Sequence, residues 1–167
     1  MKEMKNMNGL TFAITMELEG ESYYKKQADS TTNSHLKKLF LMLAKDEKKH
    51  AQLLQKNFDK TPYELYQFDT LKESKNIFSE AVDMTAVVWK TPDQMDIYRG
   101  ALDMEKKSIE LYEKFLASAT TDDDKKLFTF LVKQEKDHFA IFDDLIDFLD
   151  RPLERLETAE FGIRKEY

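Results

Sequence analysis

Apolar side chains recur every three or four residues over most of this chain, which is the spacing of helices with one buried face. Four long segments show it, at about residues 9–31, 34–59, 92–119 and 122–149. Asn33 or Ser34 can cap the second segment, and Thr121 can cap the fourth. The third segment opens with Thr91-Pro92-Asp93-Gln94, in which the proline suits the first turn of a helix. The pattern predicts four long helices, joined in two antiparallel pairs by short turns.

A connector over residues 60–91 joins the two pairs. Its capping-box patterns, Thr61-Pro62-Tyr63-Glu64 and Thr70-Leu71-Lys72-Glu73, predict two short helices. It must return along a bundle ~40 Å long and has enough residues to do so. Its apolar residues would cover one side of the bundle: Ile77, Phe78, Ala81, Val82, Met84, Val87, Val88 and Trp89. We interpret the connector as a spacer without chemistry of its own.

The C-terminal segment begins where Pro152 ends the fourth helix. A short amphipathic helix is predicted over residues 152–162, and its role would be packing. A length of 167 residues with 41% hydrophobic side chains suits one domain over residues 1–167, with its core at 9–149. The expected fold is all-α, a four-helix bundle with one long crossover connection.

Composition and charge exclude several classes of protein. The 26 basic residues are interleaved with 32 acidic ones for a net charge of -6, which argues against nucleic-acid binding. The chain has no apolar run approaching ~18 residues and no secretory signal at its start, so we expect no membrane span and a cytoplasmic location. With no cysteine, any metal must be held by oxygen and nitrogen.

The two halves of the chain repeat one set of polar residues 88 positions apart. Each half reads Glu-x6-Tyr-x22-Glu-x-x-His, so Glu17, Tyr24, Glu47 and His50 recur as Glu105, Tyr112, Glu135 and His138. In Glu-x-x-His both side chains lie on one helix face, about 5–6 Å apart at Cβ, and can reach a common ion. One such tetrapeptide is weak evidence, whereas two in register are strong evidence for a shared site.

The four repeated glutamates fall within the apolar stripes of their helices. Buried carboxylates are costly, so four converging ones would oppose folding unless something positive lay between them. Two divalent cations would balance their charge, and His50 and His138 would complete the shell. Such a ligand set suits iron or manganese, and zinc could also occupy it. The predicted metal ligands are Glu17, Glu47, His50, Glu105, Glu135 and His138.

Tyr24 and Tyr112 lie on the same stripes as Glu17 and Glu105. Their hydroxyls could hydrogen-bond a ligand carboxylate, or their rings could simply fill the core. Other polar residues are weaker candidates. We expect His35 to be a solvated surface histidine, and the acidic run of Asp143, Asp144, Asp147 and Asp150 to be a solvated face. Glu19 and Glu21 compete with Glu17, but only Glu17 has a counterpart in the second half. Gly20 and Ser108 mark a repeat position where a further carboxylate could have stood.

The sequence resembles the rubrerythrin branch of the ferritin-like superfamily. The residues that carry the resemblance are Ala13-x3-Glu17-x6-Tyr24, Glu47-x-x-His50, Ala101-x3-Glu105-x6-Tyr112 and Glu135-x-x-His138. The resemblance implies a ferritin-like bundle with a di-iron carboxylate centre, often dimeric, that reduces hydrogen peroxide or reacts with dioxygen. It also favours Glu47 and Glu135 as bridges.

Two departures from that family limit what the resemblance implies. Rubrerythrins proper carry a four-cysteine iron centre, which this chain lacks, so electrons would come from a separate donor protein. Ser108 stands at the place of their extra glutamate, leaving a set closer to the minimal ferritin-like pattern. The leading hypothesis is a redox-active di-iron protein, expected to be a homodimer. The alternatives are iron storage in a large shell, and a helical interaction module without redox chemistry.

Overall fold

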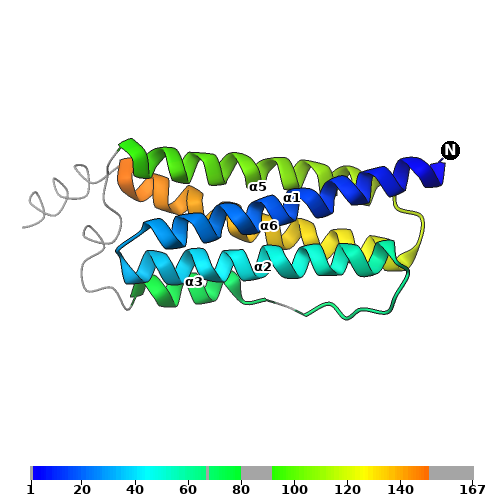
Figure 1. Cartoon of the computed structure of the whole chain (residues 1–167), viewed down its shortest axis with the longest axis horizontal. Helices are drawn as coiled ribbons and strands as arrows, with labels where there is room; N and C mark the ends of the chain where they lie inside the picture. Colours follow the sequence, from blue (N-terminus) through cyan, green and yellow to red (C-terminus); the bar gives the residue numbers. More distant parts are fainter. Residues whose placement is uncertain (1, 67, 80–91, 151–167) are drawn as a thin grey trace, which may run out of the picture.

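The computed structural model describes residues 2–66, 68–79 and 92–150 (Figure 1). Within these ranges it has five helices and no strand. The helices are α1 (Lys2–Ser30), α2 (Ser34–Phe58), α3 (Thr70–Ser79), α5 (Pro92–Ser118) and α6 (Asp122–Asp150). The predicted all-α fold with four long helices is therefore confirmed. None of the described helices combines the length and apolarity needed to cross a membrane.

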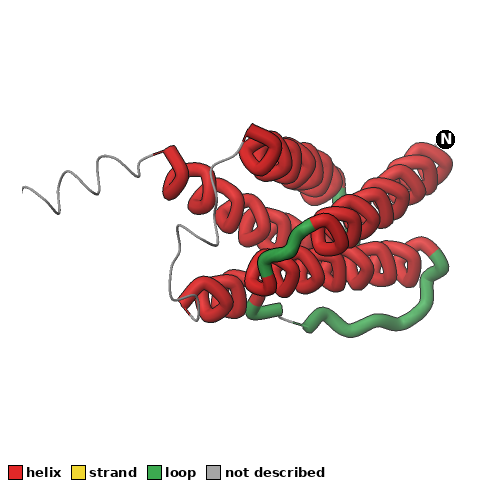
Figure 2. The backbone as a smooth tube through the Cα atoms, turned by 60° about the vertical axis from the view of Figure 1, so that its left-hand side comes forward, coloured by secondary structure: helices red, strands yellow, loops and turns green. Residues whose placement is uncertain are grey.

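The four long helices form two hairpins, as the short turns predicted. The helix α1 packs along α2, and α5 packs along α6 (Figure 1). After α2 the chain runs back along the bundle as an extended segment and then enters α3, which packs against α2 and α6 (Figure 2). The connector thus takes the chain back along the bundle, as the crossover required.

Local capping explains where two of the long helices, α2 and α6, begin. The Asn33 side chain accepts hydrogen bonds from the backbone N–H groups of His35 and Leu36, each at 3.0 Å. The Thr121 hydroxyl accepts one from the N–H of Asp124 at 3.1 Å. These side chains satisfy N–H groups that have no partner within the helix. The helix α1 instead begins at Lys2, earlier than the predicted residue 9, because good helix formers extend it beyond its apolar stripe.

The connector differs from its prediction. Residues 61–66 form no helix, so the first capping box is wrong. Thr61 instead closes α2: its N–H donates to the Lys56 carbonyl at 2.9 Å, and Lys60 adopts a left-handed φ of 55°. The second box correctly placed α3, but the Thr70 hydroxyl turns to Asp46 instead of capping the helix. Residues 80–91 and the predicted helix over 152–162 lie outside the described residues.

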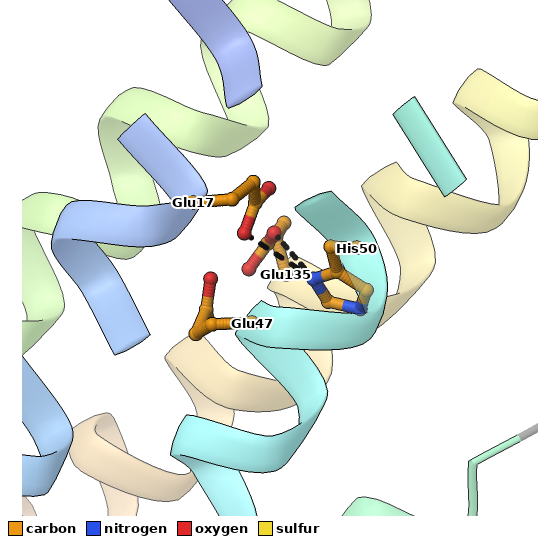
Figure 3. A group of neighbouring side chains, drawn as sticks. All are labelled: Glu17, Glu47, His50 and Glu135. Carbon is orange, nitrogen blue, oxygen red and sulfur yellow. Dashed lines mark ion pairs between the residues drawn. The ribbon is translucent and has the colours of Figure 1, made fainter. Parts of the chain in front are cut away.

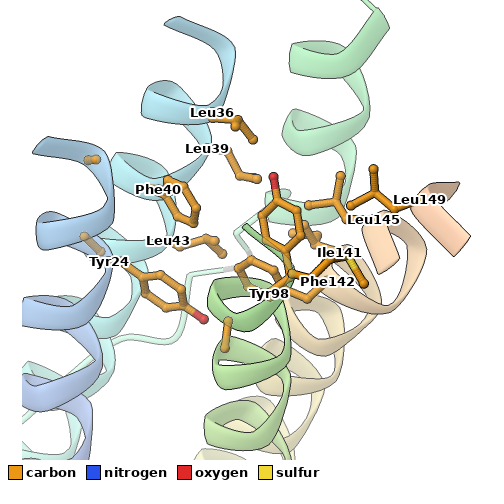
Figure 4. Close-up of a cluster of buried hydrophobic side chains, with 14 residues drawn as sticks. Tyr24, Leu36, Leu39, Phe40, Leu43, Tyr98, Ile141, Phe142, Leu145 and Leu149 are labelled. Atoms are coloured by element: carbon orange, nitrogen blue, oxygen red, sulfur yellow. The ribbon is translucent and has the colours of Figure 1, made fainter. Parts of the chain in front are cut away.

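The core consists of two apolar clusters, one at each end of the bundle interior. The first includes Tyr24, Leu39, Phe40, Leu43, Tyr98, Ile141, Phe142 and Leu145 (Figure 4). The second includes Ala13, Leu53, Leu54, Tyr112, Leu127, Phe128 and Leu131. On each long helix, the repeated glutamate falls between residues of the first cluster and residues of the second. The packing therefore leaves a polar layer between two apolar ones.

Candidate metal centre

Six predicted ligand side chains meet in this polar layer. Glu17 comes from α1, Glu47 and His50 from α2, Glu105 from α5, and Glu135 and His138 from α6. None of the six is more than 4% exposed. Figure 3 shows Glu17, Glu47, His50 and Glu135 pointing toward one another from three different helices. Helical periodicity and the repeat thus bring together the residues that the sequence singled out.

The six side chains form two overlapping groups. The first, called here the His50 cluster, consists of Glu17, Glu47, His50 and Glu135. The second, the His138 cluster, consists of Glu47, Glu105, Glu135 and His138. In each cluster, one ligand atom per residue lies within 4.8 Å of all the others. Glu47 and Glu135 belong to both clusters, so the two groups are neighbours that share two carboxylates.

Both imidazoles turn their Nδ1 atoms into the layer. His50 Nδ1 lies 3.1 Å from an oxygen of Glu135 and 3.5 Å from one of Glu17. His138 Nδ1 lies 2.9 Å from Glu47 and 3.4 Å from both Glu105 and Glu135. The ring centroids of the two histidines are 5.7 Å apart. Nδ1 is therefore the atom that each histidine offers to an ion in its cluster.

The two tyrosines make hydrogen bonds that cross between the halves of the chain. The Tyr24 hydroxyl donates to Glu105, and the Tyr112 hydroxyl donates to Glu17. Their rings also fill the core: Tyr24 stacks on Phe142 and Tyr112 on Phe128, with centroids 5.8 and 6.4 Å apart. Both interpretations of these residues from the sequence therefore hold. Each tyrosine anchors a carboxylate of the other half.

The four carboxyl groups divide into two pairs with opposite pKa shifts. Burial raises the pKa of Glu47 and of Glu135 well above the usual value, and the charges of neighbouring glutamates raise it further. Burial also opposes ionisation of Glu17, but hydrogen bonding with Glu47 and the charge of His50 outweigh it, so the pKa falls to about 2. The charge of His138 likewise lowers the pKa of Glu105 against the effect of burial.

The histidines respond to the same field. Burial lowers the pKa of His138, but the carboxylates of Glu105 and Asp46 outweigh burial and raise it well above its usual value. The pKa of His50 is also raised, chiefly by Glu17 against the effect of burial. Without a bound cation, protons held by these buried groups are what offset the negative charge of the layer.

The match to known families agrees with this geometry. The family model described as Rubrerythrin matches residues 8–146, which span all four long helices. The chain belongs to the rubrerythrin family. Proteins of this family hold a di-iron carboxylate centre, and the two clusters of buried carboxylate and imidazole groups lie within the matched region. No curated protein matches the chain. No solved structure matches it either.

The buried polar atoms of this rubrerythrin-family protein test whether a metal pair fits. Four ligand atoms make no hydrogen bond of good geometry among the described residues, although each lies within ion-pair distance of a group in the layer: Glu17 Oε2, His50 Nδ1, and both oxygens of Glu135. Buried polar atoms without partners are costly, and native proteins rarely leave them so. All four atoms belong to the two clusters. Divalent cations would supply the missing partners, so the residues fit a two-metal centre of oxygen and nitrogen ligands.

Asp46 is a site residue that sequence reasoning missed. It is 4% exposed, and its Oδ2 lies 3.1 Å from His138 Nε2 and accepts a hydrogen bond from the Thr70 hydroxyl at 2.5 Å. Burial opposes ionisation of Asp46, but these hydrogen bonds outweigh it and lower the pKa. The connector also supplies Phe68, whose ring centroid lies 6.4 Å from that of His50. Because Thr70 and Phe68 both lie next to residues of the site, the connector is more than the spacer we expected.

The weaker candidates lie outside both clusters. His35 is half-buried, with a buried Nδ1 that has no partner among the described residues, so the expected solvated histidine is wrong. Glu19 is exposed, and Glu21 pairs with Lys25 at 2.6 Å. Ser108 donates a hydrogen bond to the Met104 carbonyl at 3.2 Å. The expected solvated face is confirmed for the exposed residues Asp143, Asp144 and Asp147.

Proposed function

We propose that this protein is a redox-active di-iron carboxylate protein that reduces hydrogen peroxide or dioxygen. The observation that carries the proposal is the pair of buried clusters that share Glu47 and Glu135. Two independent metal sites would not need common ligands. Shared carboxylates, by contrast, would hold two ions next to each other, where both can act on one small molecule. Membership of the rubrerythrin family supports iron as the metal, with manganese or zinc as possible substitutes.

The clusters suggest a role for each ligand. Glu17 and His50 would hold one ion, and Glu105 and His138 the other. Glu47 and Glu135 would bridge the two ions, since each belongs to both clusters. Four carboxylates balance two divalent charges, and neutral imidazoles add no charge. Binding of the cations would release the protons that the metal-free layer holds, because metal ligands must be deprotonated.

The remaining residues would prepare the centre for chemistry. Two ferrous ions, when bound, would supply the two electrons that reduce hydrogen peroxide to water or dioxygen to the level of peroxide. Tyr24 and Tyr112 hold Glu105 and Glu17 in place through their hydroxyls. The apolar clusters on either side keep bulk water from the layer, which strengthens electrostatic interactions within it.

Because the chain has no cysteine, we propose that a separate protein donates the electrons. The cytoplasmic location stays a prediction.

Metal analysis and rapid kinetics test this proposal. We expect protein purified under anaerobic, iron-replete conditions to hold two iron ions per chain. Stopped-flow mixing of the ferrous protein with peroxide or dioxygen should then show rapid oxidation, and the faster reaction identifies the oxidant. Less than about one metal per chain would contradict the proposal and favour a helical interaction module. Slow oxidation together with a cage-sized particle on size-exclusion chromatography would favour iron storage.

Substitutions test the ligand assignment directly. Glu47→Ala removes a ligand from both clusters, and His138→Ala removes the only imidazole of its cluster. We expect each to abolish stable loading of the metal pair. His35→Ala is the control, because His35 is a histidine of α2, the helix that carries Glu47, and lies outside both clusters. This variant should retain two metals. Equal losses in all three variants would refute the assignment.

A further inference from the structure

The two histidines of the centre differ on the side that faces away from the clusters. His138 Nε2 lies 3.1 Å from Asp46 Oδ2, and the same oxygen accepts a hydrogen bond from Thr70. His50 Nε2 is equally buried but has no hydrogen-bond partner among the described residues. Its ring instead lies beside those of Phe68 and Phe130, each with its centroid 6.4 Å away. On the side that faces away from the clusters, His138 thus contacts a carboxylate, whereas His50 lies beside aromatic rings.

In the internal repeat, this difference coincides with a change of residue type between the halves. The residue in register with Asp46 is Gln134, which is 2% exposed and also directly precedes a repeated glutamate. Its Oε1 is buried and has no hydrogen-bond partner among the described residues. Within the described residues, the second half of the chain therefore makes no bond equivalent to the one from Asp46 to His138. The six repeated ligands are symmetric, but their support is not.

The physical effect of Asp46 follows from the chemistry of imidazole. An ionised carboxylate only accepts hydrogen bonds, so the Nε2 atom that contacts Asp46 carries a proton. Nδ1 also lies 2.9 Å from Glu47, and a cation bound at Nδ1 would displace any proton that this contact holds. With the proton held at Nε2, the lone pair of a neutral His138 lies on Nδ1, which faces Glu47, Glu105 and Glu135. Carboxylate support also raises the basicity of a ligand imidazole and fixes its orientation. Among the residues that the structure describes, nothing comparable fixes His50.

Thr70 extends this support into the connector. Its hydroxyl belongs to the first residue of α3 and has no role in capping that helix. Thr70 is 2% exposed, so water does not compete for the bond to Asp46. The Thr70–Asp46–His138 chain therefore joins α3, α2 and α6 in one line of hydrogen bonds.

We propose that Asp46 is a positioning residue for His138, and that the centre consequently binds its two cations with unequal strength, the His138 cluster more tightly than the His50 cluster. This inference rests on the proposed metal centre and adds an order of loading to it. Asp46 acts through His138 and contacts no ion itself. Gln134, its counterpart, has no such role.

Titration of the metal-free protein with Co²⁺ alone tests this inference. We expect the wild-type visible spectrum to develop in two steps of different affinity. Asp46→Leu removes the acceptor while keeping the branched shape of the side chain, and should weaken the tighter step by about 10- to 100-fold, leaving the weaker step unchanged. Gln134→Leu, at the matching position of the repeat, should change neither step by more than about twofold. Asp137→Asn is a second control, since Asp137 also neighbours His138 in sequence but pairs with Lys133 at 2.9 Å.

A spectroscopic readout separates positioning from a general loss of structure. In the Co²⁺ protein, an imidazole bound through Nδ1 carries a proton on Nε2 with a strongly shifted NMR resonance. We expect slow solvent exchange of the His138 proton in wild type and fast exchange in Asp46→Leu. If that variant fails to fold, Thr70→Val keeps both charged groups and should weaken the tighter step by about fivefold, the loss of one hydrogen bond.

The outcomes distinguish this inference from the proposed function. Equal weakening of both steps by Asp46→Leu, or equal effects of Asp46→Leu and Gln134→Leu, would overturn the positioning role while the metal centre stands. A single wild-type step with two equivalent ions would overturn the unequal strengths. Failure of the wild-type protein to bind Co²⁺ and Fe²⁺ would remove the metal centre, and the inference with it.

Discussion

Tyr24 on α1 donates its hydroxyl hydrogen bond to Glu105 on α5, across the two halves of the chain. In the equivalent position of the repeat, the Tyr112 hydroxyl on α5 donates a hydrogen bond to Glu17 on α1. Both rings are fully buried, one in each apolar cluster, so the bond connects the packing of the core to the orientation of a ligand carboxylate. The two tyrosines therefore offer a way to disturb the centre without removing a ligand.

Tyr24→Phe and Tyr112→Phe should each weaken metal binding by about tenfold, since the carboxylate loses the donor that orients it. The ring remains, so the free energy of unfolding of the metal-free protein should fall only by the cost of leaving a buried carboxylate without this donor, about 1–3 kcal/mol. Competition with a chelator measures the first effect and urea unfolding the second. Tyr98→Phe is the matched control. Tyr98 is also a buried tyrosine, but its hydroxyl accepts a hydrogen bond from Gln94 at 2.8 Å, and it lies outside both the His50 cluster and the His138 cluster. An equal loss of affinity in Tyr98→Phe would contradict this role.

Raised pKa values predict that the metal-free protein loses stability as pH rises. Folding raises the pKa of Glu47 and Glu135 above 4.5 and that of His138 above 6.5, so the folded state holds more protons than the unfolded state above those values. Stability then falls with rising pH. Glu17, with a pKa of about 2, acts oppositely, but its contribution is complete once the pH exceeds about 4.5.

Urea unfolding of the chelator-treated protein at mildly acidic, neutral and mildly alkaline pH measures this trend. Added metal should reverse it, because cations replace the protons and binding tightens as protons are released. The gain in melting temperature on adding Mn²⁺ should therefore be larger at alkaline than at acidic pH. Stability of the metal-free protein that rises from acidic to alkaline pH would show that the buried groups titrate differently.

Gly20→Ala should weaken metal binding, because a Cβ at position 20 would lie 3.2 Å from Glu47 Oε2. The carboxylate shared by both clusters would have to shift. The metal-free protein, by contrast, should gain up to about 1 kcal/mol from the better helix propensity of alanine. Gly100→Ala provides the control: its Cβ would lie 3.1 Å from the Tyr23 hydroxyl, a comparably close contact outside the clusters. Chelator competition should show unchanged affinity for Gly100→Ala, and an unchanged affinity for Gly20→Ala would refute the prediction.

The expected homodimer stays a prediction, and exposed side chains of the first hairpin offer a way to test it. Phe12 is 60% exposed, and Leu18 and Leu41 are each 46% exposed. Burial of such side chains against a second copy would stabilise a dimer. Analytical ultracentrifugation should show a dimer for wild type and weaker association for Phe12→Glu. Lys107→Glu, which alters an exposed residue of the second hairpin, should leave association unchanged. A wild-type monomer would refute the expectation.

Helical periodicity and the repeat were enough to predict the long helices and to choose the six residues that converge. A stripe of apolar positions gives the direction of each helix face, and the duplicated Glu-x-x-His shows which polar residues belong on it. Asp46 escaped this reasoning because it neighbours Glu47 in sequence, about 100° around the helix, where a polar residue normally faces solvent. Its burial depends on Thr70 and His138, two contacts distant in sequence that no local pattern encodes.

Thr61 and His35 show the limits of local signals. The motif that begins at Thr61 suits a helix start, but Thr61 is used to close α2, and one backbone N–H cannot serve both purposes. His35 follows a correctly predicted cap, yet its ring is partly covered. In both cases the local sequence was compatible with several environments, and packing selected one.

The sharing of Glu47 and Glu135 has a consequence for the origin of the fold. Each hairpin carries three of the six ligands, and each cluster takes one carboxylate from the opposite hairpin. A single hairpin could not assemble either cluster alone and would need to pair with a second copy of itself. Joining the two halves in one chain makes that pairing permanent and allows the halves to differ, as they do at Asp46 and Gln134.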